Sequence, residues 1–234
     1  MRGWTAATAL GFCLAFLSFL PGQQAATVLA PDDIANATRL ADIPDHIDPN
    51  DLPEGLDRGT YESLYRLNLL GHVIALGVFG LVLGSFQAYA LRRRLQRRWP
   101  WIVASAVGFV AILGLEAVRR HVVIGPHAGP VEPIAIALGG GSLAGFLQWL
   151  HLRRHGTDPT RWLGRWIAGL GVGIVASLGL LVAFEITLLP SVKALFPSEE
   201  TAMLIDWALF LVVYGAGVGL AAGWISGPPP TSPS

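Results

Sequence analysis

The chain has 234 residues, of which 53% are hydrophobic and only 14% are charged, and its 16 basic and 16 acidic residues give a formal net charge of zero. Soluble domains carry roughly a quarter charged residues, so the composition excludes an ordinary soluble domain. The chain also lacks the excess of basic residues that would indicate a nucleic-acid partner. The single cysteine, Cys13, excludes an internal disulfide and a zinc site built on several cysteines.

The first apolar run covers residues 4–20 and follows Arg2. Its basic start and the Pro21-Gly22 pair after it are typical of a secretory signal peptide. A cleavage site at Ala30 is poor, because Pro31 follows directly. Residues 1–26 are therefore predicted to be either a signal peptide or a retained N-terminal anchor helix.

An acidic segment follows at residues 27–66. Its part from residue 31 onward holds nine acidic residues and three arginines. It has too few large apolar residues to form a core of its own. Its flanking stretches, 32–41 and 59–68, could form short amphipathic helices near the membrane surface. We expect the whole segment to be extracytoplasmic.

The rest of the chain, residues 67–226, is predicted to be an all-α polytopic transmembrane bundle of five helices. A bilayer core requires about 20 mostly apolar residues in a helix. Five runs approach that requirement: 69–91, 101–118, 133–152, 166–189 and 204–226. The tail, residues 227–234, is predicted to be disordered and cytoplasmic.

The orientation follows from arginines in short loops, which favour the cytoplasmic side. Nine arginines follow the first and third of these runs: Arg92, Arg93, Arg94, Arg97, Arg98, Arg153, Arg154, Arg161 and Arg165. The sequence therefore predicts a bacterial cytoplasmic (inner) membrane protein with residues 27–66 outside and the C-terminus in the cytoplasm. Arg92, Arg93, Arg153 and Arg154 are expected to contact anionic lipid head groups.

One pattern occurs twice in the bundle, at an offset of 61 residues. The stripe Gly80, Gly84 and Gln87 recurs as Gly141, Gly145 and Gln148, each time followed by a double arginine. Downstream, Trp101 and Gly108 recur as Trp166 and Gly173 at an offset of 65. We predict a tandem parallel hairpin repeat with units at 72–120 and 133–189. A half repeat at 204–226 has Gly215 and Gly219, with Ala222 in place of the glutamine.

Positions i, i+4 and i+7 share one helix face. Glycines on that face allow close approach between membrane helices, and a glutamine there can hydrogen-bond across the interface. We therefore interpret the repeated stripe as a packing face rather than a ligand site. The motif "GFLQWLHLRR" resembles the repeated GxxQWxxLRR helices of uncharacterised bacterial multi-pass membrane proteins, although "GSFQAYALRR" has Ala88 after its glutamine. The resemblance implies a helical-hairpin fold and no activity.

Several ionisable residues fall at one depth near the outer ends of the predicted helices. These are His72, Glu116, His121, Glu132, Glu185 and Asp206. Such groups can reach interfacial water, or can line a wet cavity, relay protons or bind a divalent metal. Because no spacing matches a known metal motif, we predict no metal site, no cofactor and no catalytic residue.

Three functions remain open from the sequence. The favoured one is a non-catalytic accessory or scaffold subunit, with membrane lipids and a membrane protein or a second copy of the chain as partners. The second is a small transporter or channel with an extracytoplasmic polar vestibule, which a broken helix at the glycine run 139–141 would favour. The third is a membrane redox or metal protein that uses the outer histidines and carboxylates.

Overall fold

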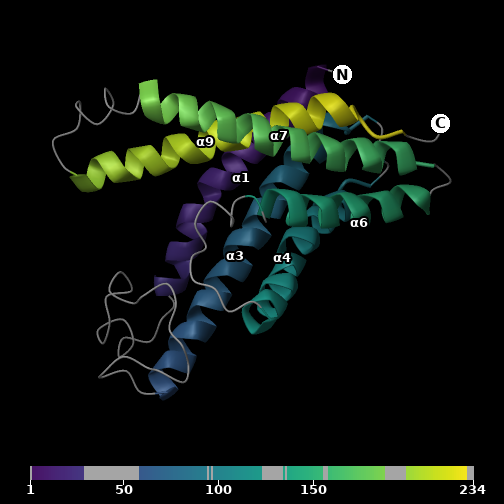
Figure 1. Ribbon diagram of the computed structural model, residues 1–234. Coiled ribbons are helices and arrows are strands. Elements are labelled where there is room, and N and C mark those ends of the chain that lie inside the picture. The colour runs from purple at the N-terminus through teal and green to yellow at the C-terminus, as the bar shows by residue number, and fades with distance from the viewer. Residues whose placement is uncertain are drawn as a thin grey trace.

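The structure is a computed structural model, and every secondary-structure element that it describes is helical (Figure 1). It describes residues 2–28, 58–93, 95, 97–122, 134, 136–154, 158–187 and 199–230. Within the helices, the side chains of residues 19–28, 58, 60–69, 72, 113–122, 136, 184–186 and 199–207 lie outside this description.

The elements follow the predicted apolar runs in chain order. They are α1 (Arg2–Val28), α3 (Arg58–Ala90), α4 (Trp99–Val122), the π-helix η2 (Ile136–Gly140), α6 (Gly141–Arg153), α7 (Thr160–Thr187) and α9 (Glu199–Ser226). The all-helical fold class is therefore confirmed.

Three helices in the described part of the chain are long and apolar enough to cross a membrane. The qualifying spans are Val73–Ala90 in α3, Thr160–Ala183 in α7 and Ala208–Ser226 in α9. A shorter apolar stretch, Trp99–Ile112, lies in α4. These lengths and compositions fit a multi-pass membrane protein.

The structure corrects two predicted boundaries. Helix α1 continues past Pro21 to Val28, because proline is tolerated inside helices of the membrane type. Helix α3 begins at Arg58, so the short helix expected over 59–68 is continuous with it. No glycine or proline separates Thr60 from Leu70, and helix propagation is favourable where nothing interrupts it.

The predicted helix at 133–152 contains a π-helical turn. Residues Ile136–Gly140 form η2, which leads directly into α6. Gly140 keeps helical dihedral angles, φ −62° and ψ −43°, so the chain widens its turn here without unwinding. A side chain on Gly139 would meet Ile112 of α4, whereas one on Gly141 would meet Leu170 of α7. The glycine run therefore allows this segment to fit closely between two helices.

The helices close into a ring. Helix α1 packs against α3, α3 against α4, α4 against η2 and α6, these against α7, and α7 against α9. Helix α9 then packs against α1, so the first and last helices of the chain are neighbours (Figure 1). The Trp4 indole Nε1–H donates a hydrogen bond of 3.4 Å to Ser226 Oγ across this last contact.

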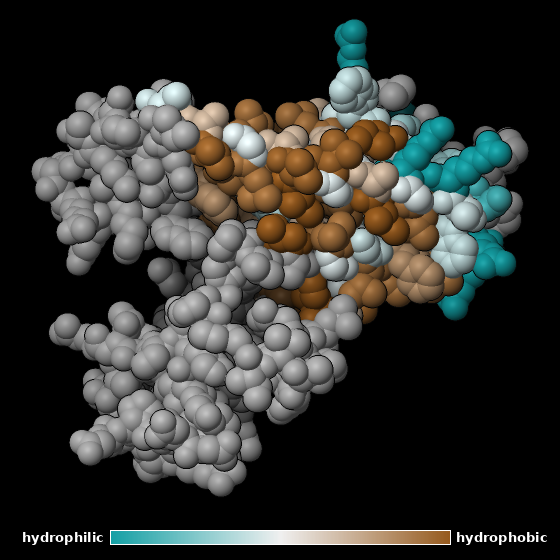
Figure 2. Space-filling model, in the orientation of Figure 1, coloured by the Kyte–Doolittle hydropathy of each residue, from teal (hydrophilic) through white to brown (hydrophobic). Residues whose placement is uncertain are grey.

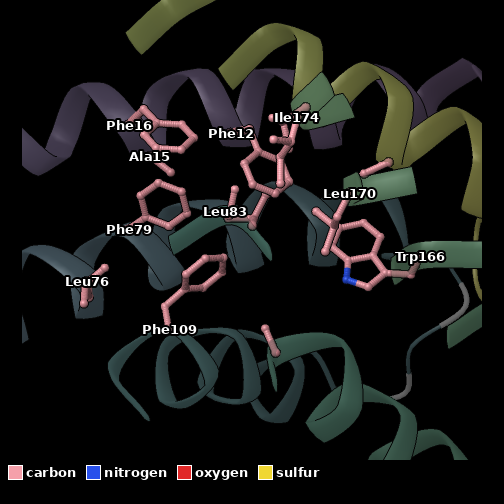
Figure 3. Packing of buried hydrophobic residues seen from close by; sticks show 14 of the residues in the cluster. Phe12, Ala15, Phe16, Leu76, Phe79, Leu83, Phe109, Trp166, Leu170 and Ile174 are labelled. Atoms are coloured by element: carbon pink, nitrogen blue, oxygen red, sulfur yellow. The ribbon is translucent and has the colours of Figure 1, made fainter. Parts of the chain in front are cut away.

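Aromatic side chains fill the centre of the bundle (Figure 3). The Phe16 and Phe79 rings are 4.8 Å apart and perpendicular, and the Phe79 and Phe109 rings are 4.6 Å apart. Phe12 stacks on Trp166 at 6.4 Å. Because these rings come from α1, α3, α4 and α7, the core joins helices that are distant in sequence.

Exposed arginines gather at one end of the molecule, where the hydrophilic surface in Figure 2 is concentrated. We call it the arginine-rich end, and its exposed arginines are Arg2, Arg92, Arg93, Arg97, Arg98, Arg153, Arg154, Arg161 and Arg165. It holds the start of α1, α4 and α7 and the end of α3, α6 and α9.

Candidate functional site

A buried polar network lies about one turn inside the arginine-rich end, between α3, α4 and α6. Gln87 of α3 and Gln148 of α6 are each 1% exposed, and Ser105 of α4 is fully buried. The glycine faces that bear the two glutamines allow this proximity. A side chain on Gly84 would meet Ser105, and one on Gly108 of α4 would overlap the backbone of Ala144 in α6.

The hydrogen bonds of this network define the orientation of both amides. Trp101 Nε1–H donates to Gln87 Oε1 at 3.3 Å, and Gln148 Nε2 donates to the same oxygen at 3.1 Å. Gln148 Nε2 also donates to Ser105 Oγ at 2.9 Å, and Ser105 Oγ donates to the Trp101 carbonyl at 3.1 Å. Since the indole can only donate, it fixes which end of the Gln87 amide faces it.

Some buried polar atoms, including one of each glutamine, have no hydrogen-bond partner. Within the described part of the chain, the buried side-chain atoms without a partner are Thr8 Oγ1, Gln87 Nε2, Gln148 Oε1, Trp149 Nε1 and Tyr214 OH. Leaving such a group unpaired costs about 1–3 kcal/mol. Each amide thus has one polar atom with hydrogen-bond partners, Gln87 Oε1 or Gln148 Nε2, and one without, Gln87 Nε2 or Gln148 Oε1.

Four tryptophans form a closed layer beside the amides. The ring centroids of Trp4 and Trp101 are 6.4 Å apart, those of Trp101 and Trp162 5.9 Å, those of Trp162 and Trp166 6.0 Å, and those of Trp166 and Trp4 6.5 Å. All four side chains are buried. Trp166 donates to the Gly141 carbonyl at 2.9 Å and Trp162 to the Gly227 carbonyl at 3.2 Å. The layer therefore tethers α1, α4 and α7 to their neighbours.

The same contact recurs at three places in the ring. Gly108 of α4 lies against Ala144 of α6, and Gly173 of α7, 65 positions after Gly108, lies against Val218 of α9. Gly11 of α1 lies against Leu83 of α3. Leu83 and Ala144 are 61 positions apart, the offset of the repeated stripe. Three different helix pairs thus use one kind of glycine contact.

The predicted packing residues lie at helix contacts. Side chains on Gly80 and Gly84 would meet α4, and side chains on Gly141 and Gly145 would meet α7. Gly145 faces the Trp166 ring, which makes its hydrogen bond to Gly141 rather than to Gln148. The two units therefore differ: Gln87 accepts a hydrogen bond from the tryptophan of its own unit, whereas Gln148 donates to Gln87 and Ser105 of the first unit.

The four arginines predicted to contact lipid are exposed at the arginine-rich end. The Arg92 guanidinium lies 4.2 Å from the centroid of the exposed Tyr89 ring, and that of Arg153 lies 5.1 Å from Trp149. Cation–π contacts of this kind are worth about 0.5–1 kcal/mol at exposed sites. They hold both guanidiniums beside aromatic side chains of the kind found at membrane interfaces.

The predicted outer polar cluster lies outside the described residues. The backbones of His72, Glu116, His121, Glu185 and Asp206 belong to α3, α4, α7 and α9, but their side chains are not described, and Glu132 is not among the described residues. Among the residues that are described, no group of three or more histidine, cysteine or acidic side chains could hold a metal ion.

Sequence reasoning identified the glutamines but missed Ser105, which bonds to Gln148, and Trp4 of α1, which packs against Trp101 and Trp166. A signal for α1 was present in the sequence. Trp4 precedes Gly11 by seven positions, as Trp101 precedes Gly108 and Trp166 precedes Gly173. Interpreting residues 4–20 as a possible signal peptide concealed this third occurrence.

No protein-family model, curated protein or solved structure matches this chain. The protein is a helical bundle with three candidate membrane spans in its described part and with buried glutamines and tryptophans near one end.

Proposed function

We propose that this chain is a non-catalytic integral protein of the bacterial cytoplasmic membrane, acting as a rigid scaffold or accessory subunit. Its unit is a helical hairpin that occurs three times around a ring, as α3–α4, α6–α7 and α9–α1. The proposal extends the tandem repeat predicted from sequence, because α1 takes the place of the returning helix that the half repeat lacked. The resemblance to multi-pass proteins with GxxQWxxLRR helices agrees with this arrangement.

The observation that carries the proposal is the tryptophan layer. Trp4, Trp101 and Trp166 come from corresponding positions of the three hairpins, and Trp4 packs edge-on against Trp101 and tilted against Trp166. Their indole N–H groups bond to the protein itself, at Ser226, Gln87 and Gly141. A centre filled with interlocked rings is suited to rigidity, because buried aromatic side chains pack at the density of a crystal.

The surface supports embedding in lipid. Large apolar side chains face outward along the helices, for example Val175 and Trp224, which are each 72% exposed. An exposed apolar face of this kind is stable only in contact with lipid or another protein. We infer that the arginine-rich end is cytoplasmic, with Arg92, Arg93, Arg153 and Arg154 against anionic head groups, and that residues 27–66 are outside.

The test uses the full chain, purified from membranes in a mild detergent. We expect an absorption spectrum of tryptophan and tyrosine alone, no stoichiometric metal, and a native mass that contains a second copy or one defined membrane protein. A haem, quinone or metal present at one per chain, and lost in Glu116→Gln or His121→Ala, would establish the redox alternative instead.

The π-helix favours a transporter as the second candidate. π-helical turns often mark functional sites. Helix η2 contains Gly139 and Gly140, two of the three residues of the glycine run 139–141 at which a broken helix would favour a transporter. A flux assay distinguishes the two candidates. Purified protein in liposomes loaded with ions or small polar solutes should give the same leak as protein-free liposomes. A flux that Gly140→Ala abolishes would replace the scaffold with a transporter.

A further inference from the structure

The outer face of α4 is hollowed near its middle. Ala106, Val107, Val110 and Ala111 line a hollow of about 290 Å³. Val107 is 50% exposed and Ala111 is also exposed, so the hollow opens towards the surroundings of the bundle. All four side chains are small and apolar, and none of them can donate or accept a hydrogen bond. The hollow is therefore suited to an apolar occupant.

The neighbouring helix α3 turns glycines towards this part of α4. A side chain on Gly80 would lie 2.5 Å from Ala106 Cα, and one on Gly77 would lie 3.7 Å from Val110 Cγ2. Because glycine has no side chain, α3 approaches α4 at these two positions without filling the space beside it. An unfilled hollow in lipid forfeits dispersion contacts, and a flexible apolar chain that packs into it restores them.

Trp99 indicates the depth of the hollow in the membrane. It is the first residue of α4 and is 64% exposed, as aromatic residues at a membrane interface are. Positions 99, 103, 106 and 110 share one helix face, so Trp99 and the hollow lie on the same side of α4. At 1.5 Å per residue, the hollow lies about 10–18 Å along the helix from Trp99. The hydrocarbon part of one leaflet is about 15 Å thick, so an acyl chain of the leaflet at this end reaches the hollow.

The loop that precedes α4 is basic. It covers residues 91–98, between the end of α3 and the start of α4, and its exposed arginines are Arg92, Arg93, Arg97 and Arg98. The Arg92 guanidinium lies 4.2 Å from the centroid of the Tyr89 ring. A guanidinium that stacks through its face keeps its N–H groups at the edge, where they can donate to a phosphate. An anionic lipid head group therefore complements the charge of this loop.

A second copy of the chain fits this face less well than a lipid does. Copies in one membrane share an orientation, because the arginine-rich end of each lies on the same side. A symmetric contact through the outer face of α4 would bring Arg97 and Arg98 of both copies to the same end of the interface, where like charges repel each other. A lipid head group instead brings negative charge to this place.

The corresponding face of α7 provides a comparison within the same chain. Val172 and Val175 come 65 positions after Val107 and Val110. Val175 is 72% exposed, whereas Val110 is partly buried beside Gly77 of α3. Val172 is 54% exposed, close to the 50% of Val107. Val172 is therefore a matched control position for a substitution in the hollow.

We propose that one anionic phospholipid binds the outside of the α3–α4 hairpin, with an acyl chain in the hollow of α4 and its phosphate against Arg92, Arg97 and Arg98. The proposal rests on the membrane embedding inferred for the scaffold function and extends it by naming one lipid class, one leaflet and one face. It differs from a general attraction of lipid to arginines, because the affinity requires the hollow and the basic loop together.

The experiment is native mass spectrometry of the full-length protein in mild detergent, titrated with phosphatidylglycerol or, separately, with phosphatidylcholine. We expect one phosphatidylglycerol to bind per chain, and to bind more tightly than phosphatidylcholine. Val107→Trp places a large side chain in the hollow and should weaken this binding at least about fivefold, or roughly 1 kcal/mol. Val172→Trp adds the same side chain at the corresponding position of α7 and should leave the binding unchanged.

A second set of variants tests the head group. Arg97→Gln combined with Arg98→Gln should weaken the binding of phosphatidylglycerol and leave that of phosphatidylcholine unchanged, because only the anionic lipid loses its charge partners. Arg161→Gln combined with Arg165→Gln removes the same charge at the start of α7 and should change neither affinity.

Three results would overturn the proposal. The first is wild-type affinity for phosphatidylglycerol in Val107→Trp, or a loss of the same size in Val172→Trp. The second is an unchanged affinity for phosphatidylglycerol in the combined Arg97 and Arg98 variant. The third is a dimer that Val107→Trp dissociates, because the hollow would then hold a second copy of the chain. The scaffold function fails separately, through the cofactor or the solute flux described above.

Discussion

Gln87 and Gln148 are two equivalent residues with unequal surroundings. Gln87 Oε1 accepts from the Trp101 indole and from Gln148, whereas Gln148 Oε1 has no donor. The difference arises because Trp101 donates to Gln87, whereas Trp166, its counterpart in the second unit, donates to the Gly141 carbonyl instead of to Gln148. A symmetric sequence motif therefore produces an asymmetric network, and the two residues should respond differently to substitution.

We predict that Gln148→Leu lowers the free energy of unfolding by about 1–2 kcal/mol, because it removes two interhelical hydrogen bonds and leaves Ser105 without its donor. The measurement is thermal or denaturant unfolding in detergent, followed by tryptophan fluorescence. Ser85→Ala, which removes an exposed hydroxyl two positions before Gln87, should have no effect. Equal losses in both variants would contradict the role assigned to Gln148.

Asp158 provides a prediction of pH dependence outside the candidate spans. Its Oδ1 accepts 2.6 Å from the Thr160 hydroxyl and 3.2 Å from the Thr160 backbone N–H, at the start of α7. The hydroxyl bond, followed by the backbone bond, lowers the pKa of this carboxyl. The folded pKa is thus below the unfolded one, so the stabilisation of the α7 start is present at neutral pH. It is lost as the pH falls through the folded pKa, below the ordinary value of 3.8.

Hydrogen exchange at the first turn of α7 checks this directly. Exchange corrected for its intrinsic pH dependence should increase at about pH 3 relative to pH 6 in the wild type. Asp158→Asn keeps an oxygen acceptor but cannot titrate, so its protection should not change between the two pH values. A pH response that persists in Asp158→Asn would assign the effect to another group.

At the level of elements, close glycine contacts determine which helices pair. A side chain on Gly219 of α9 would lie 2.6 Å from Ala9 Cα and 2.8 Å from the Thr8 carbonyl oxygen in α1. Both are backbone atoms, which cannot move aside as a flexible side chain can. By contrast, a side chain on Gly164 of α7 would meet nothing within 4 Å.

These two glycines give a matched pair of variants. Gly219→Ile should lower the free energy of unfolding by about 1–3 kcal/mol through overpacking and separate α1 from α9. Gly164→Ile makes the same change in helix propensity on a face where the added side chain meets no other atom. It should be neutral or slightly stabilising. Similar losses in the two variants would show that the contact between α1 and α9 does not control stability.

The contacts of α1 also predict the fate of the N-terminus. Because α1 packs against both α3 and α9 and provides Trp4, Phe12 and Phe16 to the core, we expect the mature protein to retain it. Intact mass spectrometry of the protein from membranes should show a chain beginning at Met1 or Arg2. A mass reduced by about the first 26 residues would establish the signal peptide instead.

At the scale of the whole molecule, one end is rich in arginine and the middle is apolar (Figure 2). We predict that the arginine-rich end is cytoplasmic.

Cysteine labelling tests this topology. Cys13 is first replaced by alanine. Single cysteines are then introduced at Asp158, which lies at the arginine-rich end, and at Gly59, near the start of α3. An impermeant maleimide should label position 59 in intact spheroplasts and position 158 only after permeabilisation. The reverse pattern would invert the topology.

Local composition determined much of this protein. Apolar stretches specify where helices lie, because the requirement to satisfy every backbone group in lipid acts on each contiguous segment by itself. The glycine and glutamine stripes were recognisable as packing faces for a similar reason, since a helix places positions i, i+4 and i+7 together whatever surrounds it. The residues of the outer polar cluster follow no such helical spacing, because they come from separate segments, and their arrangement remains a prediction.

Only the tertiary structure determined which partners meet. Helix α1 closes the ring against α9, although α1 ends at Val28 and α9 begins only at Glu199, and no local pattern encodes this pairing. The choice of Gln87 rather than Trp166 as a partner for Gln148 likewise depends on how η2 and α6 fit between α4 and α7. Hydrophobicity and charge are properties of a segment, whereas hydrogen-bond partners and ring closure depend on side chains from several segments packing at once.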